Sequence, residues 1–205
     1  VCVALNYEGT ESPLSCWVDS DRLSAVAAKA GCQDVVKLHD SGETAHFPDR
    51  AGVAAAIHEV GARCGEHDYL VLSYSGHGES IVNEHAPSGK DCMLCLRTRD
   101  GRSETMLDDE VAALIKASVL PTVRVLVLVD ACCSGGILDM DTPGLWTGWK
   151  VCCISGCTEN QCSVDSGDGG VMTNALLTVL QKKTVRRRRR RRDLSVQFVF
   201  NRMVA

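Results

Sequence analysis

The sequence contains no apolar run long enough to cross a membrane and no recognisable targeting segment at its start. A transmembrane helix needs roughly 18 or more consecutive apolar residues, and no window of this chain approaches that length. Residues 1–6, VCVALN, lack the charged start, the apolar core and the cleavage site of a signal peptide. These absences argue against a membrane-spanning protein and lead us to expect a cytoplasmic or nuclear location.

The cysteines lack the spacing of a zinc site. The chain has 12 cysteines, but Cys92-x-x-Cys95 and the adjacent Cys152 and Cys153 have no second knuckle with zinc-finger spacing and no nearby His. A disulfide framework is not expected either, since the cysteines are spread through the predicted strands and helices of a mid-sized domain. We therefore expect reduced thiols, most of them packed in the core.

Length and composition predict one globular domain over residues 1–205, with 45% hydrophobic residues and a net charge of −4. Nine of the 22 basic residues lie in a basic insertion at 182–192, as Lys182, Lys183 and Arg186 to Arg192. The remainder carries 13 basic against 26 acidic residues, a net charge of −13. Such an acidic body favours calcium or basic peptides as partners, and only the arginine run at 186–192 suits nucleic acid.

Strand-like apolar runs and helix-like periodicities alternate along the chain. The strand-like runs lie at 1–6, 34–38, 69–74, 92–96, 125–129 and 151–155, and the amphipathic segments at 19–31, 48–61, 108–115, 172–180 and 196–203. Residues 79–90 are expected to form a polar loop. The alternation predicts an α/β fold, an α/β/α sandwich with a central, mostly parallel sheet.

The most informative stretch is residues 125–136, VLVLVDACCSGG. An unbroken apolar run ends at Asp130 and is followed at once by Cys132. A buried parallel strand delivers side chains in this way to the carboxyl edge of a sheet, where open α/β sheets place their chemistry. The thiol of Cys132, followed by a glycine-permitted turn, is therefore a candidate nucleophile.

A glycine-flanked histidine, His77, ends another predicted strand, within YLVLSYSGHG at 69–78. If the two strands are neighbours, this imidazole can activate a thiol whose pKa is ordinarily about 8.5 and can then protonate a leaving amine. The backbone N–H groups of Gly78 and Cys132 are candidate donors to a developing oxyanion. The pattern suits acyl transfer, although an inert buried cysteine and a turn histidine explain the same spacing equally well.

Together the two motifs resemble those of the caspase-like cysteine peptidases, and of type I-like metacaspases in particular. The matching segments are YSGHG at 74–78, DACCSG at 130–135, NYEGT at 6–10, LSCWVD at 14–19, ISGC at 154–157 and QCSVD at 161–165. The resemblance spans about residues 1–180 and implies a caspase-like sandwich, with a large-subunit-like part at 1–140 and a small-subunit-like part at 150–205. It also implies a monomeric thiol endopeptidase in which His77 and Cys132 form the catalytic pair.

The same resemblance implies a specificity pocket for Arg or Lys in the substrate. The matching positions are Asp19 and Asp130, with Cys16 and Ser75 beside them. This assignment is physically reasonable, because a guanidinium group in a partly closed pocket needs charge-assisted hydrogen bonds and two flanking carboxylates supply them. The plain alternatives are that Asp19 caps a helix and that Asp130 is a hydrogen-bonding residue at a strand end.

Calcium is the cofactor that the resemblance implies, held by four acids. The matching residues are Asp91, Asp108, Asp109 and Asp139. Calcium is a hard cation that binds several carboxylate oxygens, and the acidic body of the chain is consistent with it. Each acid also has an ordinary explanation, since acids favour helix starts and occur in loops.

One departure keeps two other functions open. The resembled family usually has His after the nucleophile, where this chain has Cys133. A catalytically impaired pseudo-peptidase would act as a binding scaffold for basic or misfolded polypeptides. A thiol redox sensor would use Cys132 with Cys133, or the cysteines around Cys152.

Overall fold

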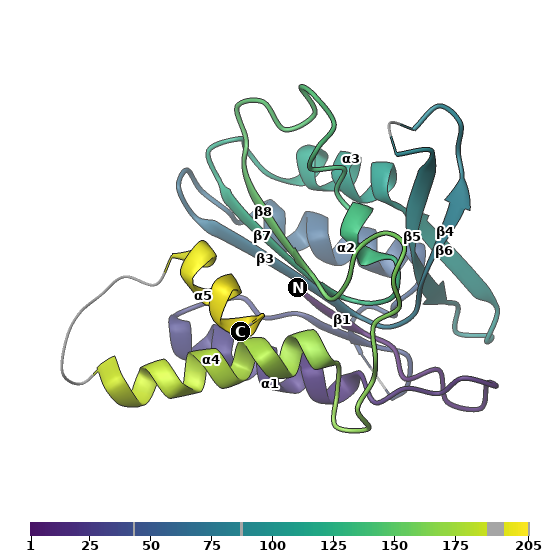
Figure 1. Cartoon of the computed structure of the whole chain (residues 1–205), viewed down its shortest axis with the longest axis horizontal. Helices are drawn as coiled ribbons and strands as arrows, with labels where there is room; N and C mark the ends of the chain where they lie inside the picture. The colour runs from purple at the N-terminus through teal and green to yellow at the C-terminus, as the bar shows by residue number, and fades with distance from the viewer. Residues whose placement is uncertain (43, 87, 188–194, 205) are drawn as a thin grey trace.

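A parallel sheet forms the centre of the molecule. The computed structural model describes residues 1–42, 44–86, 88–187 and 195–204, and in this part of the chain the sheet has five strands in the order β2-β1-β3-β7-β8 (Figure 1). The strands are β1 (Cys2–Ala4), β2 (Lys37–His39), β3 (Tyr69–Ser75), β7 (Arg124–Asp130) and β8 (Lys150–Ser155). Every pair of neighbours is parallel, as the apolar runs predicted.

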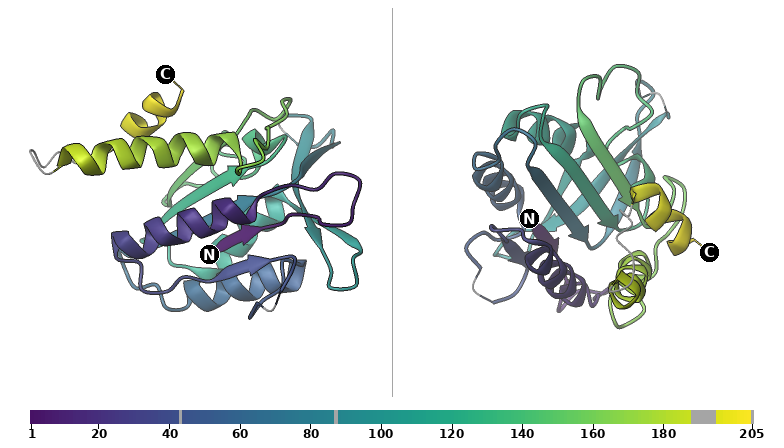
Figure 2. Two further views of the ribbon diagram at one scale, coloured as in Figure 1. Left: turned by 90° about the horizontal axis from the view of Figure 1, so that it is seen from below. Right: turned by 90° about the vertical axis from the view of Figure 1, so that its left-hand side faces the viewer.

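Helices cover both faces of the sheet, which confirms the predicted α/β/α sandwich (Figures 1 and 2). One face carries α1 (Trp17–Ala30) and α4 (Val171–Arg187), with α5 (Val196–Met203) beside α4. The other face carries α2 (Arg50–Gly61) and α3 (Asp108–Ser118). None of the helices described is long and apolar enough to cross a membrane.

A second, antiparallel sheet lies beside the carboxyl end of β3 (Figure 1). It consists of β4 (Gly78–Val82), β5 (Lys90–Arg97) and β6 (Ser103–Leu107). The prediction of a polar loop at 79–90 is therefore wrong for residues 79–82 and for residue 90, and β6 was not predicted. Both strands are short and partly exposed, so neither has the apolar run that identifies a buried strand.

Other element boundaries differ from the predictions by a few residues. The strand expected at 34–38 is β2 at Lys37–His39, and the helix expected at 172–180 is α4, which continues to Arg187. Residues 188–192 of the predicted basic insertion lie outside the described residues. The helix expected to begin with a cap among residues 19–21 begins at Trp17, whose N–H donates to Asn6 Oδ1 (3.0 Å).

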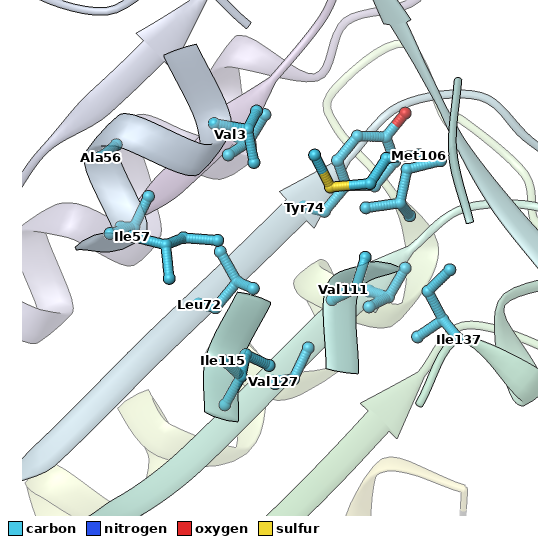
Figure 3. Close-up of a cluster of buried hydrophobic side chains, with 14 of the residues drawn as sticks. Val3, Ala56, Ile57, Leu72, Tyr74, Met106, Val111, Ile115, Val127 and Ile137 are labelled. Carbon is cyan, nitrogen blue, oxygen red and sulfur yellow. The ribbon is translucent and has the colours of Figure 1, made fainter. Parts of the chain in front are cut away.

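Aliphatic side chains from both layers fill the space between the sheet and helices α2 and α3 (Figure 3). Val3, Leu72 and Val127 come from three neighbouring strands and meet Ile57 and Ile115, and none of these side chains is more than 3% exposed. Fully burying one such side chain stabilises the fold by about 1.5–3 kcal/mol. This packing fixes β1, β3 and β7 side by side.

The register of β3 and β7 brings their carboxyl ends level. The pairing runs from Tyr69 opposite Arg124 to Ser75 opposite Asp130. Residues that follow the two strands therefore emerge together at one edge of the sheet, where the small antiparallel sheet also begins.

Candidate active site

His77 and Cys132 lie at this shared edge, as the sequence predicted. Each follows its paired strand end by two residues, His77 after Ser75 and Cys132 after Asp130. The N–H of Gly76 donates to the carbonyl oxygen of Asp130 (3.3 Å), which continues the pairing beyond the strands. The structure thus satisfies the condition on which the predicted pair depended, that the two strands are neighbours.

Two buried tyrosines fix the backbone of His77, and sequence reasoning did not find them. The His77 N–H donates to Tyr7 Oη (2.9 Å), and the Tyr74 hydroxyl donates to the His77 carbonyl oxygen (2.7 Å). A Cβ on Gly76 would lie 2.7 Å from both tyrosine hydroxyl oxygens. A side chain at residue 76 would therefore displace the groups that position the histidine.

The ring of His77 has a defined tautomer. Its Nε2 lies 2.8 Å from the carbonyl oxygen of Ser12, which can only accept, so Nε2 carries the proton. In the neutral ring Nδ1 is then the unprotonated nitrogen. The ring of Tyr7 packs against the imidazole, with centroids 4.4 Å apart. The orientation leaves Nδ1 as the basic atom of the site.

The thiol of Cys132 is half-buried and faces the segment that follows β8. Its Sγ donates to the carbonyl oxygen of Ser163 (3.7 Å), and the N–H of Cys133 donates to the carbonyl oxygen of Gln161 (2.9 Å). Burial raises the pKa of Cys132. Within the described residues no hydrogen bond joins His77 to Cys132. The resting thiol is therefore neutral, and a base must remove its proton before it can act as a nucleophile.

Gly78 lies against the backbone of the nucleophile segment. A Cβ at this position would come 2.2 Å from the carbonyl oxygen of Cys132 and 3.1 Å from the Cβ of Ala131. Only a glycine permits this approach. The two predicted oxyanion donors, Gly78 and Cys132, are therefore brought together, while the neighbouring N–H of Cys133 is already bonded to Gln161.

The predicted pocket residues also converge. Asp19 is buried and accepts from Ser75 Oγ (2.5 Å) and from the N–H of Gly170 (2.9 Å), so it is a buried acceptor and does not cap α1. Burial raises the pKa of Asp19 to about 6. Cys16 is buried beside Ser75, and burial raises its pKa to about 12, which keeps this thiol neutral.

Asp130 completes this group from the end of β7. Its carboxylate accepts from Ser163 Oγ (2.8 Å) and from the N–H of Thr173 (2.8 Å). A Cβ on Gly170 would lie 2.1 Å from an oxygen of Asp130, and one on Gly169 would lie 2.2 Å from an oxygen of Asp19. The two glycines before α4 therefore let both carboxylates approach the same loop.

A third acid, Asp165, belongs to the same loop and was not predicted as a site residue. Its oxygens accept from the N–H and Oγ of Ser15 (2.5 and 2.6 Å) and from the N–H of Gly167 (2.9 Å). Burial opposes the charge of this carboxyl, but the hydrogen bonds from Ser15 and Gly167 hold its pKa below the ordinary value. Asp165 stands in the QCSVD segment, but its partner is 150 residues away and no local pattern links them.

The four predicted calcium acids lie on three segments near one another. Asp91 is the second residue of β5 and accepts from Asn83 Nδ2 at both oxygens (2.9 Å each). Asp108 begins α3 and accepts from the N–H of Cys92 (2.6 Å) and that of Asp109 (2.9 Å). Asp139, three residues beyond the short helix η1 (Ser134–Gly136), has a positive φ of 43°.

Asp139 shows that these acids repel one another. Burial, and then the charges of Asp108 and Asp109, raise its pKa to about 7. In the described part of the chain none of the four forms a salt bridge. No group of three or more metal-binding side chains is assembled there as a ready cage either. The four acids lie near one another, but in the described structure they are not arranged as a coordination sphere.

Comparison with known families identifies the family to which the chain belongs. A family model described as the metacaspase, peptidase C14 domain matches residues 1–141, which include His77 and Cys132. The chain belongs to the metacaspase family. It therefore carries a caspase-like, cysteine-type peptidase domain, and the resemblance drawn from its motifs is confirmed.

Curated metacaspases align with most of the chain. Metacaspase-2 of Arabidopsis thaliana is 24% identical over 216 residues, covering 89% of this chain and 51% of that protein. Metacaspase-2 of Trypanosoma brucei brucei is 25% identical over 217 residues, covering 87% of this chain and 62% of that protein. This metacaspase chain thus spans about half the length of the curated relatives it matches.

Solved structures agree with the architecture. Protein GSU0716 from Geobacter sulfurreducens superposes with a TM-score of 0.70 at 26% identity, covering 100% of this chain and 87% of that chain. Caspase-1 from Spodoptera frugiperda superposes with a TM-score of 0.58 at 18% identity, covering 89% of this chain and 68% of that chain. The second likeness concerns the fold alone, and it confirms the caspase-like sandwich.

Proposed function

We propose that this metacaspase domain is a calcium-activated cysteine endopeptidase that cleaves peptide bonds after Arg or Lys and acts as a monomer. One observation supports the specificity: Asp19 and Asp130 both contact the 165–170 loop, to which Asp165 belongs, and this loop follows Ser163, the residue that contacts the Cys132 thiol. Among the described residues, none of the three pairs with a basic side chain of the chain itself. Their charge is therefore not neutralised by a salt bridge within the described structure.

A substrate Arg or Lys supplies the missing positive charge. A guanidinium group donates several hydrogen bonds in fixed directions, and carboxylates on two sides of a pocket accept them. An acidic substrate side chain would be repelled by the same three acids. Hydrogen bonds from Ser75, Ser163 and Ser15 hold the carboxylates in place, so little ordering is needed when the substrate binds.

The chemistry follows from the positions of His77 and Cys132. Nδ1 of His77 accepts the Cys132 proton, and the thiolate sulfur attacks the carbonyl carbon of the scissile bond. The backbone N–H groups of Gly78 and Cys132 donate to the oxygen that becomes negative. The imidazolium then gives its proton to the leaving amine, a thioester forms on Cys132, and water hydrolyses it with the same imidazole as base.

Calcium suits the second group of acids by its chemistry. Asp91, Asp108, Asp109 and Asp139 offer hard oxygen ligands, and their mutual repulsion is compensated by no basic side chain in the described structure. A bound cation would remove this repulsion and would tie β5 and α3 to the segment after η1. That segment is joined to Cys132 through the short helix η1, so its order affects the nucleophile.

A fluorogenic peptide assay tests the proposal. Turnover of an Arg peptide is expected with calcium, with a large loss on chelation and little turnover of a matched Asp peptide. Cys132→Ala should lower the turnover by at least about a thousandfold, because no other group forms the thioester. Equal turnover by Cys132→Ala, or equal rates on Arg and Asp peptides, would contradict the proposal.

A binding scaffold is the second candidate, and one observation favours it. The Cys132 thiol bonds to Ser163 and the His77 ring bonds to Ser12, so in the described structure the pair is not joined. A scaffold would bind Arg peptides through the same acids but would not hydrolyse them at any calcium concentration. Measuring binding and turnover on the same peptide separates the two functions.

A further inference from the structure

A second cysteine, Cys162, lies beside the nucleophile. It stands between Gln161 and Ser163, and the carbonyl oxygens of both neighbours touch the nucleophile segment. Gln161 O accepts from the N–H of Cys133 (2.9 Å), and Ser163 O lies 3.7 Å from the Sγ of Cys132. Cys162 is thereby held on both sides against residues 132–133, and its side chain is exposed.

The two thiols also interact directly. Burial is the largest cause that raises the pKa of Cys132, and the Cys162 side chain is the second largest. A thiol next to a nucleophilic cysteine can attack a sulfenic acid formed on that cysteine, and a disulfide results.

Other cysteines near the site are less suited to this role. Cys133 is partly buried and packs against the main apolar core. The Cys157 thiol already donates to Ala131 O and Gln161 O (3.2 Å each) and touches Ser134 Oγ (3.7 Å). Cys152 contacts the carbonyl oxygen of Cys153, on β8. Cys162 is the exposed thiol at the nucleophile.

We propose that Cys132 and Cys162 form a reversible disulfide when the protein meets a hydroperoxide, which makes the nucleophile a modification site with its own resolving cysteine. The Cys132 thiolate attacks the terminal peroxide oxygen, the O–O bond breaks, an alcohol or water leaves with a proton, and a sulfenic acid remains on Cys132. The Cys162 sulfur then attacks the Cys132 sulfur, the S–O bond breaks, and water leaves with the Cys162 proton. The two sulfur atoms together lose two electrons, which the peroxide gains.

The bond has two structural consequences. It removes the nucleophile from reaction, and it covers Cys132 against further oxidation to sulfinic or sulfonic acid, which thiols do not reverse. It also ties the nucleophile to the loop in which Ser163 holds Asp130. A dithiol reductant restores both cysteines. The loss and recovery of turnover rest on the proposed peptidase function, whereas formation of the bond does not.

Peptide mapping tests the bond without any activity measurement. The reduced chain is treated with a limited amount of hydroperoxide, alkylated and digested without reduction. A Cys132–Cys162 linked peptide should be the main cross-link, and the intact chain should lose the mass of two hydrogen atoms. The outcomes that would overturn the proposal are a main link from Cys132 to any other cysteine, mainly intermolecular links, and no link at all.

Two matched variants complete the test. Cys162→Ser should send Cys132 on to sulfinic and sulfonic acids, so recovery of free thiol by dithiol falls at least about tenfold. Cys157→Ser, which removes a nearby thiol that contacts Ala131 O and Gln161 O, should behave like the unchanged chain. Equal recovery in Cys162→Ser contradicts the proposal. If the Arg peptide is not cleaved, the peptidase proposal is wrong. The presence or absence of the linked peptide still tests the disulfide proposal.

Discussion

The molecule holds two groups of acids at the same edge of its sheet, and their surroundings differ. The pocket acids, Asp19, Asp130 and Asp165, accept hydrogen bonds from serine hydroxyls and from backbone N–H groups across long chain separations. The calcium-group acids, Asp91, Asp108, Asp109 and Asp139, have fewer donors. The carboxylate of Asp139 has none in the described structure, and its pKa is raised to about 7.

The difference shows two ways in which a protein keeps carboxylates together without basic partners. Neutral donors fix each of the pocket acids in one orientation, which is the preorganisation that the proposed binding of a guanidinium group requires. In the described structure no basic side chain compensates the repulsion between the acids of the calcium group. A divalent ion would therefore gain more electrostatic binding free energy there than a singly charged group. Four variants or conditions test whether this contrast is real.

The largest effect is expected from Asp130→Asn. Neutralising a buried partner of the substrate charge should lower kcat/KM for an Arg peptide about 100-fold, or about 2–3 kcal/mol, and should leave a peptide with a neutral residue at that position little changed. Asp168→Asn is the matched control, because Asp168 is an exposed acid on the same loop. Equal losses of kcat/KM on both peptides would show that Asp130 supports the fold and does not bind the charge of the substrate side chain.

The pocket also shows what the sequence could predict. Asp130 and Ser75 end paired apolar strands, and such runs are visible in sequence, so their meeting at one edge was predictable. Asp165 was not, because its place depends on Ser15, 150 residues earlier, and on two glycines that admit Asp19 and Asp130. Strands β4 and β6 were missed for a similar reason. Both form by pairing with β5, and their polar sequences contain no local pattern that predicts this pairing.

The second effect concerns calcium. Asp139→Asn should raise the calcium concentration for half-maximal activity about 30-fold, because it removes a carboxylate whose repulsion with Asp108 and Asp109 a bound calcium ion would relieve. Titrating turnover of the Arg peptide against free calcium measures it. Asp141→Asn is the control, as an exposed acid two residues away that is outside the predicted group. An unchanged calcium midpoint in Asp139→Asn would remove this acid from the site.

A smaller effect separates Asp165 from the other pocket acids. Asp165→Asn should lower kcat/KM for the Arg peptide about tenfold, less than Asp130→Asn, because three hydrogen bonds from Ser15 and Gly167 already spread its charge. The loss should appear mainly in KM, since the residue binds the substrate side chain and does not touch the reacting atoms. A loss confined to kcat would contradict a role in binding and would indicate that Asp165 positions the loop.

The smallest effect is on stability, and it compares the two groups within one experiment. Both Asp139, with its pKa raised to about 7, and Asp19, with its pKa raised to about 6, favour the protonated form in the folded state. Their contribution to the free energy of unfolding is fully present below the ordinary pKa near 3.8 and is lost as pH rises through 6 and then 7.

Denaturant unfolding at pH 5, 6, 7 and 8 measures this loss with and without calcium. The loss that belongs to Asp139 should be about 1 kcal/mol, because its carboxyl is half-exposed and solvent screens the repulsion. Calcium should restore stability at pH 8, where the cluster is ionised, and should do little at pH 5, where Asp139 is protonated and binds the ion weakly. The part that belongs to Asp19 should not respond to calcium, and Asp139→Asn should abolish the calcium-sensitive part alone. If calcium removed the whole pH dependence of the free energy of unfolding, the two groups of acids would be coupled. They would then not differ as described, with one group stabilised by hydrogen bonds and the other by a bound ion.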